Sequence, residues 1–136
     1  MNVSLVSVAT PELHELWAHA RKDVVAKRGG VALMTTLYGN TPESDFFEHV
    51  IATSSLWSVS DDEVVLGFGV FRHQVVEALY VAPAFRRQKA ATALVKALMA
   101  SETPPLDAYA LPGDRAMKSL FESLGWKARL LMMRGA

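Results

Sequence analysis

The chain has 136 residues, which is the length of one domain. Hydrophobic residues make up 51% of it and charged residues 21%, which excludes an intrinsically disordered chain. The 14 Lys and Arg balance the 14 Asp and Glu, so a general nucleic-acid-binding surface is not expected. The sequence has no cysteine, which excludes cysteine nucleophiles, disulfides and cysteine zinc sites. It also has no signal-peptide pattern and no apolar run of ~20 residues, so we expect a soluble cytoplasmic domain with no membrane partner.

Helix-start and helix-stop signals divide the first third of the chain. Residues 3–8 alternate well enough to predict a strand. A helix is expected to begin at Thr10-Pro11-Glu12, with Thr10 as N-cap and Pro11 at the first helical position, and to stop at Gly29-Gly30. Thr41-Pro42-Glu43 repeats the start signal and predicts a second helix. Residues 31–37 are ambiguous in pattern, and a further helical turn is one interpretation.

The remaining two-thirds of the chain predict strands first and then alternating helices and strands. The expected elements are strands over 55–60, 64–72 and 74–81, a helix from 90 to Pro104-Pro105, a strand over 106–111, a helix from Asp114 through Leu124 with a stop at Gly125, and a strand over 126–133. The resulting order is β-α-α-β-β-β-α-β-α-β. It indicates a layered α/β (α+β) fold with a mixed, mostly antiparallel central sheet flanked by helices.

The residues from 81 to 92 carry the clearest chemical signal. A strand ends at Val81, and a short loop with Arg86, Arg87 and Lys89 opens directly onto a helix whose first residues are small. A helix start presents unpaired N–H groups and a positive dipole, so basic side chains are unfavourable there unless an anion is also present. The pattern therefore predicts a phosphate or diphosphate site. A solvated helix start is the alternative.

Two segments resemble signatures of the GNAT family of N-acetyltransferases. Val81, Pro83, Arg86 and Ala91 match the family's acyl-CoA-binding pattern, Val-x-Pro-x-x-Arg-x-x-Gly-x-Gly/Ala. Residues 114–126 are similar to its second signature, a helix that ends in Tyr-Glu-x-x-Gly-Phe. The order of elements is also similar over most of the chain. The resemblance implies a single GNAT-like acyl-CoA-binding domain over residues 1–136.

The resemblance also implies an activity: acetyl transfer from acetyl-CoA to an amine of a small molecule or protein, by direct attack in a ternary complex. A catalytically weak or inactive binding module, such as a subunit of a larger assembly, is the alternative. Glu77 is implied as the acceptor of the amine proton, although it could instead be an exposed strand carboxylate or a partner of Arg72. The implied cofactor-binding residues are Leu79, Val81, Arg86, Arg87, Gln88, Lys89, Ala90, Ala91 and Thr92.

Three features depart from the family pattern. Lys89 occupies the position of the first loop glycine, where its side chain could contact phosphate or crowd it. Phe121 replaces the tyrosine that often protonates the leaving thiolate, so this role is vacant or is taken by water, Tyr80 or Tyr109. Eleven residues follow Gly125, which gives room for one strand. We therefore expect the acceptor side to be open or completed by a second subunit, as in a homodimer.

The four histidines do not predict a metal site. His14 and His19 are five positions apart on one expected helix, which is poor ligand spacing, and His49 and His73 have no companions at ligand spacing. We expect all four to be structural or surface residues.

Overall fold

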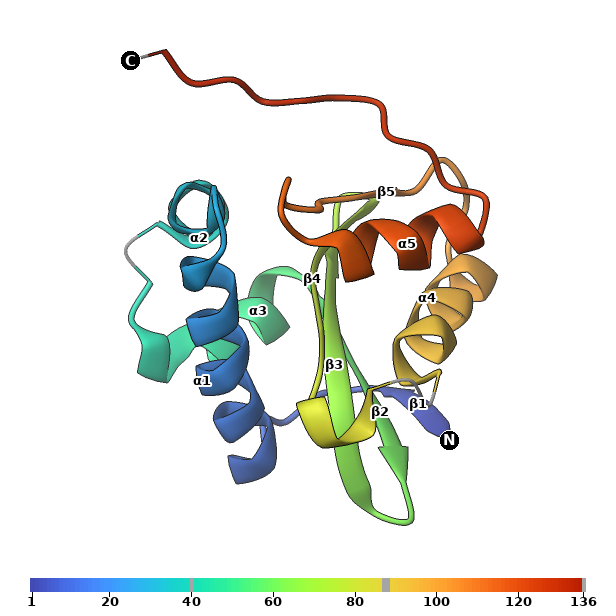
Figure 1. Ribbon diagram of the computed structural model, residues 1–136. Helices are drawn as coiled ribbons and strands as arrows, with labels where there is room; N and C mark the ends of the chain where they lie inside the picture. The colour runs from blue at the N-terminus through green and yellow to red at the C-terminus, as the bar shows by residue number, and fades with distance from the viewer. Residues whose placement is uncertain (40, 87–88, 136) are drawn as a thin grey trace.

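The computed structural model describes residues 1–39, 41–86 and 89–135, and it places helices on both faces of a central sheet (Figure 1). The elements are β1 (Asn2–Leu5), α1 (Pro11–Ala26), α2 (Gly30–Tyr38), the 3₁₀ turn η1 (Glu43–Asp45), α3 (Phe46–Thr53), β2 (Ser55–Asp61), β3 (Val64–Arg72), β4 (Val75–Val81), the 3₁₀ turn η2 (Pro83–Phe85), α4 (Ala90–Ser101), β5 (Asp107–Ala108) and α5 (Arg115–Ser123). The predicted fold class is confirmed.

The sheet has five strands in the order β1-β2-β3-β4-β5. The first three pairings are antiparallel. Short turns join β2 to β3 and β3 to β4, whereas α1, α2 and α3 lie between β1 and β2. β4 and β5 are parallel, because α4 crosses over between them.

Local signals explain where the helices begin and end. The Oγ1 atom of Thr10 accepts a hydrogen bond from the Leu13 N–H at 3.3 Å, and Oδ1 of Asp114 accepts one from the Met117 N–H at 3.1 Å. Both side chains satisfy a backbone donor that a helix start leaves free. Gly125 follows α5 with a φ of +87°, a conformation that favours glycine, so the predicted stop is confirmed.

Apolar helix faces cover both sides of the sheet. On one side, buried residues of α1 and α3, such as Leu16, Trp17 and Phe47, pack against Phe68 and Val70 of β3. On the other side, Leu94 and Leu98 of α4 and Phe121 of α5 pack against the opposite sheet face. Each such large side chain contributes about 1.5–3 kcal/mol on burial. These two layers hold the strands on which the candidate site is built.

The structure corrects the expected order of elements at three places. The ambiguous residues 31–37 lie within a full helix, α2, which adds a third helix between β1 and β2. Gly30, its first residue, lies so close to α1 that a Cβ atom would be 1.7 Å from the Val24 carbonyl oxygen. The strand expected over 106–111 is limited to β5, of two residues. The strand expected over 126–133 is absent from the described structure, since these residues pair with no strand and follow an irregular path above the sheet (Figure 1). Apolar and basic side chains alternate from Trp126 to Leu130, but residues 130–133 are all apolar, so the signal that fixes a register is lost there.

Among the described residues, none of the helices combines the length and the apolar character that crossing a membrane requires.

Candidate functional site

The candidate site begins where β4 and β5 diverge. The two strands are paired only at Val75 with Asp107 and at Val76 with Ala108. The last hydrogen bond between them joins the Tyr109 N–H to the Val76 carbonyl at 3.1 Å. β4 continues to Val81, so in the described part of the chain the β4 edge that faces away from β3 has no strand beside it from residue 77 onward. Such an edge can accept an extended ligand as an additional strand.

A bulge in β4 turns Glu77 and Tyr80 toward the same side of the sheet. Val70 pairs with Ala78 and Phe71 with Val76, so Glu77 is an extra residue with no partner on β3. Residues three positions apart in a regular strand face opposite sides, whereas a bulge shifts this alternation by one. Tyr80 and Ala78 accordingly pack with the α1 cluster, while Leu79 and Val81 pack with α4.

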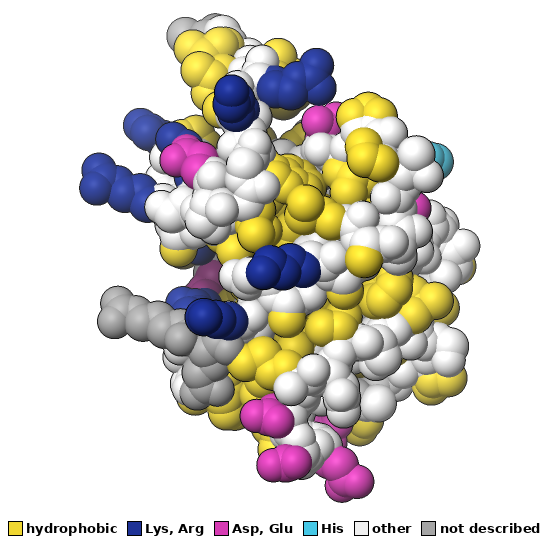
Figure 2. All heavy atoms as spheres, turned by 90° about the vertical axis from the view of Figure 1, so that its right-hand side faces the viewer, with side chains coloured by type: hydrophobic (Ala, Val, Ile, Leu, Met, Phe, Trp, Pro, Cys, Tyr) yellow, Lys and Arg dark blue, Asp and Glu magenta, His cyan; other side chains and the backbone are white. Residues whose placement is uncertain are grey.

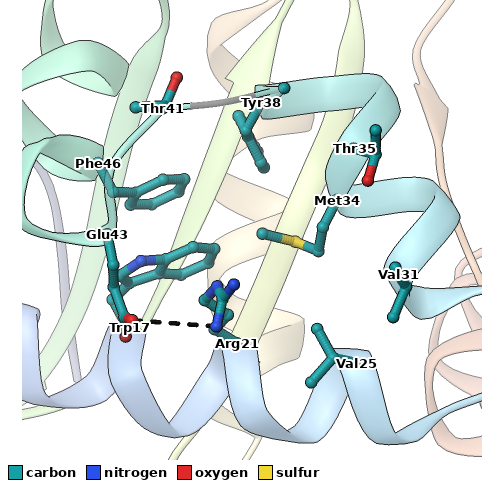
Figure 3. A pocket seen from close by; sticks show the side chains of 11 residues that line it. Trp17, Arg21, Val25, Val31, Met34, Thr35, Tyr38, Thr41, Glu43 and Phe46 are labelled. Atoms are coloured by element: carbon teal, nitrogen blue, oxygen red, sulfur yellow. Dashed lines mark ion pairs between the residues drawn. The ribbon is translucent and has the colours of Figure 1, made fainter.

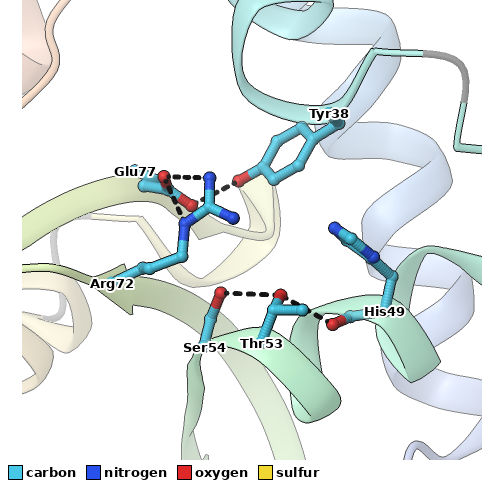
Figure 4. Close-up of polar contacts among 6 residues, drawn as sticks. All are labelled: Tyr38, His49, Thr53, Ser54, Arg72 and Glu77. Carbon is cyan, nitrogen blue, oxygen red and sulfur yellow. Dashed lines mark hydrogen bonds and ion pairs between the residues drawn. The ribbon is translucent and has the colours of Figure 1, made fainter.

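Glu77 belongs to a buried polar cluster with Arg72 and Tyr38 (Figure 4). Only 7% of Glu77 is exposed, and its Oε2 accepts hydrogen bonds from Arg72 Nη2 at 2.8 Å and from Arg72 Nε at 3.1 Å. Its other oxygen, Oε1, accepts a longer hydrogen bond of 3.5 Å from the Tyr38 hydroxyl. The sequence left two alternatives to a catalytic role for Glu77, an exposed carboxylate and a partner of Arg72. The structure shows that Glu77 is buried and paired with Arg72.

Tyr38 is a member of the cluster that the sequence did not predict. Burial, and next the negative charge of Glu77, raise the pKa of its hydroxyl, so the hydroxyl keeps its proton and donates a hydrogen bond to Glu77. It is the last residue of α2, just after the ambiguous segment 31–37, and 39 positions separate it from Glu77. No spacing rule links residues so far apart.

The same tyrosine lines a cavity of about 330 Å³ between α1, α2 and η1 (Figure 3). Arg21 and Glu43 lie side by side in its lining as a half-exposed ion pair of 3.9 Å. The lining residues are Trp17, Arg21, Val25, Val31, Met34, Thr35, Tyr38, Gly39, Thr41, Glu43 and Phe46. The cavity thus combines aromatic walls with one charge of each sign, and Tyr38 connects it to Glu77.

Arg86 holds the turn after β4 in place. Its Nε donates to the Val81 carbonyl at 3.0 Å, its Nη2 lies 3.3 Å from Asp23 on α1, and its guanidinium stacks over the Tyr80 ring at 5.5 Å. The guanidinium therefore fixes η2 against β4 and α1. This structural role is by itself a sufficient reason for an arginine at this position.

Lys89 adopts the backbone conformation that a glycine would adopt at its position. It precedes α4 as the N-cap with a φ of 65°, in the left-handed region, and its side chain makes no capping hydrogen bond. A residue with a Cβ atom costs about 1–2 kcal/mol more than glycine in this conformation. The loop thus keeps the glycine-type geometry despite the lysine.

The first turn of α4 is suited to the approach of an anion to the backbone. Ala90 is buried and Ala91 and Thr92 are half-buried, and the turn contains no acidic side chain. The N–H groups of a first helical turn have no partner within the helix. Arg87 and Gln88, also expected to bind the cofactor, lie outside the described residues.

The structure separates the two tyrosines proposed as proton donors. Tyr80 is buried beneath Arg86, and burial raises the pKa of its hydroxyl. Tyr109 follows β5, on the other wall of the divergence, with 48% of its surface exposed. In the described hydrogen bonds, Glu77 is joined to Tyr38 and Arg72, and to neither of these two residues. Phe121 is a core residue that packs against Trp126.

Comparison with known proteins gives one family and one fold. Residues 52–128, more than half of the chain, match the family described as "Acetyltransferase (GNAT) domain". A search of curated proteins finds no match. Across residues 1–39, 41–86 and 89–135, no group of three or more His, Cys, Asp or Glu side chains is placed to hold a metal ion.

Solved structures with the same fold include several acetyltransferases. Ribosomal-protein-alanine N-acetyltransferase from Brucella melitensis biovar Abortus 2308 aligns with a TM-score of 0.70 at 16% identity, over 98% of this chain and 100% of that one. Aminoglycoside antibiotic 6'-N-acetyltransferase AAC(6')-IG from Acinetobacter haemolyticus gives 0.65 at 14%, over 100% and 97%. Aminoglycoside N-acetyltransferase AAC(6')-Iy in complex with CoA gives 0.61 at 15%, over 99% of each chain. At such identities the likeness shows the fold alone.

Proposed function

Because the chain belongs to the GNAT acetyltransferase domain family, we propose that it transfers an acetyl group from acetyl-CoA to an amine. One observation carries the proposal: the unpaired edge of β4 leads directly to the free N–H groups at the start of α4. Structures of the same fold that contain CoA or a CoA bisubstrate analogue support this choice of donor.

We assign the cofactor to the edge of β4 and the start of α4. The pantetheine arm lies along residues 79–81 and pairs with their backbone, as an added strand does. The diphosphate accepts hydrogen bonds from the N–H groups of residues 87–92, where the helix dipole also favours negative charge. The Lys89 ammonium adds a full positive charge at the same place. Arg86 contributes by holding the loop in position, through its hydrogen bond to Val81 and its ion pair with Asp23.

In the proposed reaction the amine nitrogen attacks the thioester carbonyl carbon directly. The new C–N bond forms, the C–S bond breaks, and the electron pair leaves with the CoA sulfur. Backbone N–H groups of β4 stabilise the oxyanion that develops at the carbonyl oxygen. Holding both reactants in one site supplies most of the remaining acceleration.

Glu77 receives the proton that the amine loses. Arg72 holds the carboxylate through Oε2 and leaves Oε1 directed at the Tyr38 hydroxyl. Since Tyr38 also lines the cavity, we place the acceptor amine there. Tyr38 then takes the amine proton as it passes its own proton to Oε1. This route lets a carboxylate with 7% exposure act without direct contact with the substrate.

The thiolate needs a proton as it leaves, and Tyr109 fits this role better than Tyr80. Tyr109 is half-exposed on the β5 side of the divergence, whereas Tyr80 is buried against α1 and covered by Arg86. Water is the alternative donor. A Tyr109→Phe variant that keeps full turnover assigns the step to water.

A binding module without catalysis is the second candidate, and the pairing of Glu77 with Arg72 favours it. A carboxylate fixed in an ion pair can be purely structural. The two functions differ in one result, since a binding module binds acetyl-CoA but releases no CoA thiol when amines are added.

The decisive assay measures thiol release from acetyl-CoA in the presence of a panel of amines. The protein has no cysteine, so a thiol reagent detects only CoA. Glu77→Gln is expected to lower kcat by about 100-fold or more with unchanged acetyl-CoA affinity. Glu63→Gln is the matched control, because it makes the same change from carboxylate to carboxamide at an exposed position of the β2–β3 turn. This variant is expected to keep full activity. Equal turnover in the two variants removes Glu77 from the mechanism.

A further inference from the structure

The cavity between α1, α2 and η1 has the size of a site for a small molecule. Its volume of about 330 Å³ lies at the lower end of the range for ligand pockets, so it can hold a compact molecule or a single side chain. The buried rings of Trp17, Tyr38 and Phe46 line it together with the side chain of Met34. Walls of this kind favour an acceptor with an apolar body.

Arg21 and Glu43 place one full charge of each sign at the mouth of this cavity. Their ion pair is long, at 3.9 Å, and their side chains keep 48% and 50% exposure. Figure 3 shows the pair at one end of the lining and Tyr38 at the other, with Trp17 and Met34 between them. Such a loose, exposed pair contributes little to stability, so a ligand can separate its two members easily. Figure 2 shows a different face of the molecule, on which basic side chains gather toward the top and acidic ones toward the bottom.

The closeness of the two charges decides which ligands they can bind. A ligand with an additional carboxylate at the mouth would contact Arg21 but would be repelled by Glu43, 3.9 Å away. A ligand with an additional ammonium meets the reverse arrangement. A ligand with no charge there would cover both side chains without replacing the water that solvates them. An ammonium and a carboxylate close together on the ligand give each side chain a partner of opposite sign.

We propose that the acceptor is a free α-amino acid whose side chain ends in a primary amine, as in lysine. This inference rests on the proposed function and names the substrate class for the same cavity. The α-carboxylate binds Arg21 and the α-ammonium binds Glu43, while the aliphatic chain lies against the aromatic walls. The terminal amine reaches Tyr38, loses its proton by the route through Glu77 and takes the acetyl group, as the CoA sulfur leaves with the electron pair of the C–S bond. A lysine side chain within a polypeptide carries no α-charges, so it lacks both contacts at the mouth.

Three matched amines test this recognition beside L-lysine. 1,5-Diaminopentane is lysine without the carboxylate, 6-aminohexanoate is lysine without the α-amine, and pentylamine lacks both groups. Thiol release from acetyl-CoA should give a kcat/KM for lysine about tenfold or more above that for diaminopentane or 6-aminohexanoate, because each analogue loses one charged contact. An equal kcat/KM for lysine and pentylamine overturns the inference.

Three variants assign the two preferences to their residues. Arg21→Gln should remove the preference for lysine over diaminopentane, and Glu43→Gln should remove the preference for lysine over 6-aminohexanoate. Arg28→Gln alters an exposed arginine outside the cavity lining, so it is the control and should keep both preferences. If Arg21→Gln and Glu43→Gln also keep both, the ion pair only ties η1 to α1 and the inference is wrong.

Calorimetry keeps this inference separate from the proposed function. L-lysine and the three analogues are titrated into the chain in the presence of saturating CoA, which has no acetyl group to transfer. Tighter binding of lysine supports the inference even if no amine releases thiol from acetyl-CoA, in which case the proposed function alone fails. If amines do release thiol but lysine binds no more tightly than pentylamine, or does not bind, the proposed function stands and the inference is overturned.

Discussion

Replacing Arg72 by methionine should destabilise the fold strongly, because it leaves the Glu77 carboxylate buried without its partner. Glu77 has 5% side-chain exposure and Arg72 has 23%. Removing one member of a buried ion pair costs about 3–5 kcal/mol, and the partial exposure of Arg72 places this case near ~3 kcal/mol. The melting temperature should fall by roughly 10 °C. Glu77→Gln keeps the shape and removes the charge, so it should cost about 1–2 kcal/mol.

A double-mutant cycle separates this pairing from ordinary packing. The Arg72→Met/Glu77→Gln variant should lose about 2–3 kcal/mol, less than the sum of the single changes, because it leaves no buried charge. Urea denaturation followed by circular dichroism gives all four free energies of unfolding. Additive losses would show that Arg72 and Glu77 do not interact, and the account of the buried cluster would then be wrong.

Two further predictions concern backbone strain and alkaline pH. Lys89→Gly should raise the free energy of unfolding by about 1 kcal/mol, because Lys89 has a φ of 65°; a loss of stability in urea denaturation would contradict the assigned geometry. The pKa of Tyr38 is raised above its ordinary value of 10.0 in the folded state, so its contribution is complete below pH 10.0 and is lost as the pH rises toward the folded pKa. Tyr38→Phe should therefore flatten the decline in stability above pH 10.0, and an unchanged slope in pH-dependent melting would refute this contribution.

The sequence predicted those parts of the structure that depend on local chemistry. Thr10 and Asp114 cap their helices because a short side-chain acceptor before a helix can satisfy a free N–H group. Gly125 ends α5 because it adopts a positive φ. Between residues 81 and 92 the chain passes from the end of a strand through a basic loop to a helix start with small residues. Because these parts are contiguous in the chain, their order alone predicted that they lie together.

The parts that the sequence did not predict depend on long-range contacts. The bulge at Glu77 arises from pairing with β3, and the sequence of β4 gives no sign of it. Tyr38 reaches Glu77 from a different layer of the fold. The expected strand over 126–133 also depends on long-range contacts: Trp126 packs against Phe121, but residues 130–133 are exposed and pair with no strand in the described structure.

The most direct measurement of the central claim is the thermal stabilisation of the chain by acetyl-CoA. At 100 times its Kd the ligand should add about 2.7 kcal/mol to the free energy of unfolding. Lys89→Glu should weaken binding by about tenfold or more, whereas Lys96→Glu, the same charge reversal at an exposed position of α4, should not. If millimolar acetyl-CoA leaves the unaltered chain's melting temperature unchanged, the start of α4 does not bind the cofactor.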